Sequence, residues 1–340
     1  MHLAVYIGLN CLYFIFGVLL VNTIRKEFFS QAKKKIFKVD SHNDIFIPEQ
    51  RDKSNYYLNQ LLKQPHLPNF IFILPRADLL LQPENFWNVL NMKYIHNLDY
   101  VFNYLTPCYD PDSYQDRRRL ELDIHTSKTF PMFFILRGRK NDNSIFKVED
   151  KKDYFDLESK YRENNFQLIQ RIESNIFSFQ NKIFVLETYL LCVRRPLEEG
   201  NKKHKVEMYR SKNIRYMLLD MISGKLVSCQ KMEALLQTNF FSTPYEVILK
   251  DIQKKYDFLA QNFCPVLGDK IEGLDSTCFE ILSVKFILNS RFETYIYRID
   301  RDIEIFDNND SIIFTALVQE VYTFLKKKKK LNTEILIPIC

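Results

Sequence analysis

Residues 3–21 form a largely apolar stretch that is uninterrupted by any charged side chain. At a rise of about 1.5 Å per residue, a helix of this length crosses roughly the 30 Å hydrocarbon core of a bilayer. No Lys or Arg precedes the stretch, and residues 17–21 offer no small-x-small cleavage site, which argues against a removable signal peptide. The stretch therefore predicts an uncleaved transmembrane helix. The alternative is a buried N-terminal helix, although such helices are usually shorter or carry polar residues.

Basic residues follow the stretch closely and predict its orientation. Loops rich in Lys and Arg stay on the cytosolic side of a membrane, so the body of the chain is expected in the cytosol. The seven cysteines fit a reducing compartment, because they show no CxxC pair and no metal-ligand spacing. The basic residues are Arg25, Lys26, Lys33, Lys34, Lys35 and Lys38.

Composition excludes several classes of function. Only 7 glycines are present, and neither a P-loop nor a Rossmann fingerprint occurs. The net charge of +6 is modest and spread along the chain, and no nucleic-acid-reading motif is recognisable. Nucleic acid is therefore not an expected partner.

The chain divides into five regions. The predicted membrane helix at 3–21 precedes a polar juxtamembrane linker at 22–55, an N-terminal part of the body at 56–130, a main domain at 131–325 and a basic tail at 326–340. Strands separated by helices, some too closely spaced for a crossover helix, predict a mixed or antiparallel α/β core. Strands are expected at 70–74, 133–136, 166–170, 184–193, 214–219, 279–287 and 294–299, and helices at 246–263 and 311–327. Residues 106–128 are expected to form a loop and a polar helix.

Two segments of the main domain carry a resemblance to a known family. Residues 278–286 read CFEILSVKF and residues 294–300 read TYIYRID. They look like the last strand pair of the tubulin-tyrosine ligase family, where the pattern is roughly Cys-Phe-Glu-Ile-Leu-Gly-Val-Asp-Phe followed by a strand ending Glu-Val-Asn. Four upstream patches occur in the family's order: LIQRI at 168–172, KIFVLETYLL at 182–191, a tyrosine-rich turn YRSKNIR at 209–215, and LQTN at 236–239.

The resemblance implies an ATP-grasp fold, in which two sheets enclose a cleft, and it covers about residues 130 to 300. The chemistry implied is activation of a carboxylate by ATP, followed by displacement of the phosphate by an amine. Arg215 and Asp300 take catalytic positions by this resemblance, and Asp300 also a metal-binding one. The implied nucleotide-binding positions are Arg137, Gln170, Arg171, Lys182, Asn239, Lys285 and Arg298.

Several of these positions depart from the family's pattern. Lys285 and Arg298 stand where the family has two metal-binding carboxylates, and Asp300 replaces an asparagine. Two cations at a magnesium position would repel the ion, so ATP is an implied cofactor and magnesium is not. Glu187 replaces an arginine on the acceptor side, and residues 141–144 read NDNS where a glycine-rich loop is expected.

These substitutions leave three interpretations open. The fold could be retained with a decayed site, or Lys285 and Arg298 could neutralise phosphates in place of magnesium. The chain could also be an active ligase that modifies a protein carboxylate such as an acidic tubulin tail. We expect a membrane-anchored, degenerate ATP-grasp protein that binds or scaffolds, with the membrane and tubulin or another acidic protein tail as partners.

Overall fold

The computed structural model describes residues 45–46, 54–64, 66–138, 143–164, 166–172, 175–176, 178–179, 182–196, 203–221, 225–228, 242–301, 303, 316–321, 323–324 and 335–339. The predicted membrane helix at 3–21 lies outside these residues, as do Asn239 and the lysines at 326–330. Within the part of the chain that is described, no helix combines the length and the apolar character needed to cross a membrane.

Two long antiparallel strands form the centre of the large sheet. β8 (Lys182–Arg194) pairs with β12 (Thr277–Leu288) from Cys278 opposite Arg194 to Ile287 opposite Val185. β13 (Thr294–Asp300) extends β12, while β10 (Arg215–Asp220) and β9 (Val206–Ser211) pair with the two halves of β8. The described part of this mixed sheet has ten strands, completed by β1 (Ile45–Phe46), β2 (Phe70–Ile71), β7 (Ser178–Phe179), β11 (Leu226–Ser228) and β14 (Leu336–Pro338).

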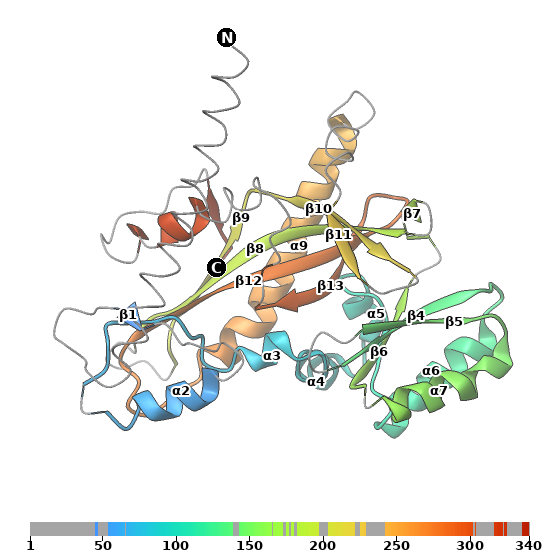
Figure 1. Cartoon of the computed structure of the whole chain (residues 1–340), viewed down its shortest axis with the longest axis horizontal. Helices are drawn as coiled ribbons and strands as arrows, with labels where there is room; N and C mark the ends of the chain where they lie inside the picture. The colour runs from blue at the N-terminus through green and yellow to red at the C-terminus, as the bar shows by residue number, and fades with distance from the viewer. Residues whose placement is uncertain are drawn as a thin grey trace, which may run out of the picture.

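A smaller antiparallel sheet lies beside the large one (Figure 1). Its order is β3 (Cys108–Tyr109), β6 (Leu168–Ile172), β4 (Met132–Arg137) and β5 (Asn143–Val148). Side chains alternate between its two faces. Phe134, Leu136 and Ile169 pack with α6 (Tyr114–Thr126) and α7 (Tyr154–Glu163), whereas Ile135 and Ile172 pack against the large sheet.

The helix α9 (Ser242–Leu267) covers one face of the large sheet, as Figure 1 shows. Its buried Tyr256 and Phe263 belong to the same apolar cluster as Leu186 and Leu190 of β8. Four shorter helices near the start of the body precede the small sheet, and a 3₁₀ turn, Lys151–Asp153, leads into α7. These helices are α2 (Ser54–Leu61), α3 (Asp78–Leu81), α4 (Pro83–Tyr94) and α5 (Leu98–Phe102).

The opposite face of the large sheet is divided into two apolar regions. Val185 and Ile287 belong to the cluster that packs against the small sheet. Leu191 and Ile281 belong to a separate cluster that includes residues of the helical segment 316–321 and of β14. Between these clusters, the same face carries charged and polar side chains, and these form the candidate site.

The predicted mixed α/β core with two sheets is confirmed, and so is the antiparallel pairing of β12 with β13. Two local predictions are wrong. Residues 209–211 lie in β9 rather than in a turn, because they pair with β8, and residues 143–144 begin β5 rather than a loop. The predicted strand at 70–74 is only two residues long, and β5, β9 and α7 were not predicted from the sequence.

Two predicted terminal regions also contribute short strands to the sheet. Ile45–Phe46, within the predicted linker, pairs with β2, and Leu336–Pro338, within the predicted basic tail, pairs with β9. Residues outside the predicted body therefore form part of the described fold.

Candidate functional site

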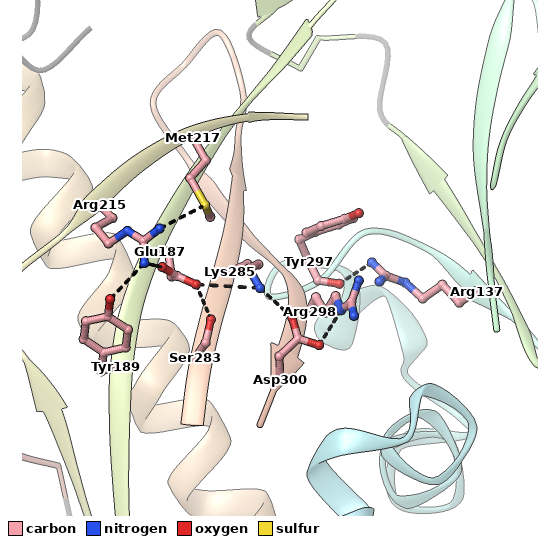
Figure 2. A network of polar contacts seen from close by, with 10 residues as sticks. All are labelled: Arg137, Glu187, Tyr189, Arg215, Met217, Ser283, Lys285, Tyr297, Arg298 and Asp300. Carbon is pink, nitrogen blue, oxygen red and sulfur yellow. Dashed lines mark hydrogen bonds and ion pairs between the residues drawn. The ribbon is translucent and has the colours of Figure 1, made fainter. Parts of the chain in front are cut away.

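Four charged side chains form one row across four neighbouring strands of the large sheet (Figure 2). Arg215 on β10 is opposite Glu187 on β8, Glu187 is opposite Lys285 on β12, and Lys285 is opposite Arg298 on β13. Residues directly opposite one another point to the same face of a sheet. The strand register alone therefore brings these four residues, hereafter the charged row, together.

The two carboxylates of this site each lie between cations. Glu187 forms an ion pair with Arg215, whose Nη1 lies 2.9 Å from Oε2, and its Oε1 lies 3.6 Å from the Nζ of Lys285. Asp300 accepts from Lys285 Nζ at 2.6 Å through Oδ2 and from Arg298 Nε at 2.5 Å through Oδ1. Both oxygens of Asp300 are therefore engaged by fixed cations.

Burial and charge act differently on the two carboxyl groups. Burial raises the pKa of Glu187, and the nearby Lys285 and Arg215 only partly oppose this effect. Burial would also raise the pKa of Asp300, but Lys285 and Arg298 outweigh it and hold that pKa below its ordinary value. Asp300 is thus firmly ionised at neutral pH.

Arg137, on β4 of the small sheet, is a buried cation whose direct partners are uncharged. Its Nε donates to Gln170 Oε1 at 2.8 Å, and its Nη2 donates to Gln170 Oε1 and to the backbone oxygen of Tyr297. The guanidinium also lies 4.3 Å from the centre of the Tyr297 ring. Only 3% of Arg137 is exposed, so its charge is compensated neither by solvent nor by a directly bonded carboxylate.

The site as a whole has an excess of positive charge. Among the described residues, its four cations, Arg137, Arg215, Lys285 and Arg298, face two carboxylates, which gives these six side chains an excess of two positive charges when both carboxylates are ionised. Such a site attracts an anion and repels a divalent cation.

A small cavity of about 60 Å³ opens between the two sheets beside Arg137. Arg137 and Gln170 line it from the small sheet, and Arg298 and Asp300 line it from β13. It has room for roughly four water molecules or one small oxyanion. Apolar residues such as Ile135, Val185 and Ile287 fill the neighbouring space between the sheets.

The structure brings six of the residues named from the sequence into this site and places two, Arg171 and Lys182, outside it. Arg137, Gln170, Arg215, Lys285, Arg298 and Asp300 lie in or beside the charged row. Arg171 instead pairs with Asp123 at 2.5 Å, and Lys182 begins β8 opposite Asp220. Asn239 lies outside the described residues. The roles of all nine in binding or catalysis stay predictions.

Three contributors to the site were not singled out from the sequence. Ser283 Oγ donates to Glu187 Oε1 at 2.5 Å, Arg215 Nη1 donates to Tyr189 Oη at 3.1 Å, and Tyr297 contacts Arg137. Ser283 and Tyr189 lie two positions from Lys285 and Glu187 along their strands. Because residues two positions apart on a strand lie on the same face, Ser283 and Tyr189 could have been predicted as neighbours of the charged row.

Comparison with protein-family models gives no match, and neither does a search of curated proteins. The geometry of the site therefore carries the functional argument.

Proposed function

We propose that this chain is a membrane-anchored, degenerate ATP-grasp protein related to the tubulin-tyrosine ligases, which binds or scaffolds rather than ligates. The charged row is the observation that supports this proposal. Lys285 and Arg298 occupy adjacent strands at the positions where the resemblance implies magnesium-binding carboxylates, and they share the single carboxylate of Asp300.

Magnesium does not fit these residues. The ion prefers six oxygen ligands at about 2.1 Å, with one or two carboxylates from the protein. Lys285 on β12 and Arg298 on β13 share the carboxylate of Asp300, and both oxygens of that carboxylate already accept from these cations. Among the described residues, no group of three or more His, Cys, Asp or Glu side chains could hold a metal ion.

A phosphate or carboxylate group fits the site better. The uncompensated guanidinium of Arg137 lines the small cavity together with Arg298, and guanidinium groups bind such oxyanions with paired hydrogen bonds. The cavity of about 60 Å³ is far smaller than the roughly 300–1,000 Å³ of most ligand pockets. A whole nucleotide would therefore require the two sheets to move apart, whereas an acidic protein tail could present a single carboxylate.

Calorimetric titration of the full-length chain with ATP, with and without magnesium, tests this proposal. Magnesium should leave the affinity unchanged or weaken it, because the ion competes with Lys285 and Arg298 for the phosphate oxygens. The double variant Lys285→Asp with Arg298→Glu should bind ATP only when magnesium is present. The control variant Lys212→Asp with Arg118→Glu makes the same change in charge at exposed positions and should behave like the natural chain.

Two other results have clear meanings. Tight, magnesium-dependent binding of ATP by the natural chain would overturn the proposal in favour of an ATP-dependent ligase that acts on a protein carboxylate. Absence of binding under both conditions would exclude ATP as a ligand and leave scaffolding as the remaining role.

A further inference from the structure

A second and larger cavity, of about 440 Å³, lies at the far end of the same strands. On β4 and β6, Arg137 is opposite Leu168 at one end and Phe133 is opposite Ile172 at the other. Phe133 and Ile172 line the second cavity, so it is separate from the charged row. Its remaining lining residues are Ser127, Thr129, Pro131, Met132, Arg171, Ile176, Ser178, Ile183 and Met221.

Polar and apolar groups contribute about equally to the walls of the second cavity. They come from the start of β4, the end of β6 and the start of β8, together with Ile176 and Met221. Three hydroxyl-bearing residues, Ser127, Thr129 and Ser178, lie among them. Methionine side chains are flexible and polarisable, so Met132 and Met221 can adapt to the shape of a ligand.

Arg171 is the one charged residue among the described residues that line this cavity. Its Nη1 donates to Asp123 Oδ2 at 2.5 Å, and the same carboxylate oxygen accepts from the Tyr109 hydroxyl. Asp123 therefore neutralises Arg171 locally. The site around the charged row has an excess of positive charge among its described residues, so the two sites favour ligands of different charge.

We propose that the second cavity binds an uncharged small molecule of about two fused rings, or an equivalent volume, that carries a hydrogen-bonding group. Its volume of about 440 Å³ falls in the range of roughly 300–1,000 Å³ that is usual for small-molecule sites. Because Asp123 neutralises Arg171, the one charged residue of the described lining, an anion has no advantage there. The inference does not depend on the proposed function, because it uses none of the residues of the charged row.

Methyl NMR of the full-length chain, labelled with ¹³C at the methionine methyl groups, tests this site directly. The probe is 2-naphthol, which is neutral at pH 7, and the matched anion is 2-naphthoate. We expect 2-naphthol to shift the Met132 and Met221 signals saturably, and 2-naphthoate to shift them at least tenfold more weakly. Met208 lies in the core on the other face of the large sheet, and its signal should not move.

Tryptophan substitutions that fill the cavity provide a second test with the same NMR measurement. Ser178 is an exposed lining residue, so Ser178→Trp should abolish the shifts at Met132 and Met221. Ser159→Trp makes the same substitution at an exposed position of α7 and should leave them intact. Thr129→Trp serves as a second filling variant if an altered Met208 signal shows that Ser178→Trp is misfolded. The proposal is overturned if the Met132 and Met221 signals do not saturate, if 2-naphthoate is as effective as 2-naphthol, or if a folded filling variant retains the shifts.

Discussion

At the scale of single residues, the cations of the charged row depend on two buried carboxylates, Glu187 and Asp300. Glu187 lies on a central strand with 1% of its surface exposed, and it separates Arg215 from Lys285. Removing one partner of a buried ion pair leaves the other charge uncompensated in a region of low polarity. Burial raises the pKa of Glu187, and Lys285 is the cation that opposes this effect most, so losing Lys285 is expected to destabilise the fold.

Lys285→Met should reduce the free energy of unfolding by about 3–5 kcal/mol, because it leaves Glu187 and Asp300 without their shared counter-charge. Urea unfolding, followed through the fluorescence of the single tryptophan, Trp87, measures the change. Adding Glu187→Gln should recover part of the loss, since the two residues are coupled. The exposed control Lys254→Met should stay within about 0.5 kcal/mol of the natural chain. A loss this small for Lys285→Met would contradict the ionised network.

Asp300 should make the stability of the chain depend on pH in the acid range. Lys285 and Arg298 overcome the effect of burial and lower its pKa from the ordinary 3.8 in the folded state. The unfolded chain therefore binds a proton more readily, and the stabilisation is present above about pH 4 and lost as the pH falls through the lower folded pKa. Asp300→Asn should flatten the dependence of the urea midpoint on pH below 4. An unchanged slope would show that Asp300 is not held by these cations.

At the scale of elements, the central strands were predicted from strongly apolar segments, whereas the peripheral strands β5 and β9 were not predicted because their sequences are more polar. Residues 184–193 and 279–287 are mostly apolar, and both lie within the long central strands. Three of the six residues in each of β5 and β9 are polar or charged, so their patterns resemble those of loops and turns. The charged row depends on the register between four strands, which a single sequence does not fix; only the family resemblance placed Lys285 beside Arg298.

The packing of helix α9 against α4 and the large sheet should contribute strongly to the free energy of unfolding. Phe263 is fully buried and stacks on Phe86 of α4, with ring centres 4.9 Å apart. Phe263→Ala should cost about 3–5 kcal/mol through lost burial and the cavity it leaves. Phe155→Ala removes the same side chain from α7, where it is 69% exposed, and should cost about 0.5 kcal/mol or less. Similar midpoints for the two variants in urea would contradict the packing of α9 against α4.

At the scale of the whole molecule, two cavities of different character lie at opposite ends of the space between the two sheets. The inter-sheet space has the cationic cavity beside Arg137 at one end and the uncharged second cavity beside Phe133 and Ile172 at the other. Apolar residues of both sheets occupy the region between them. A ligand at one end would therefore reach the other only if the sheets moved relative to each other, which would couple the two sites through the packing of this apolar cluster.

The predicted anchor determines where both sites would operate. The uncharged stretch at 3–21, with basic residues behind it, predicts that the full-length chain resists extraction by alkaline carbonate and has its body in the cytosol. Glu149→Asn with Lys151→Thr creates a glycosylation acceptor at two exposed positions and leaves the capping residues Asp150 and Asp153 in place. In cells with a secretory pathway this acceptor should stay unmodified, whereas an acceptor in an extension ahead of Met1 should be glycosylated, because the N-terminus would then face the lumen. Modification of the first acceptor instead of the second would reverse the predicted orientation. It would place the charged row outside the cytosol, where neither ATP nor tubulin would be available to it.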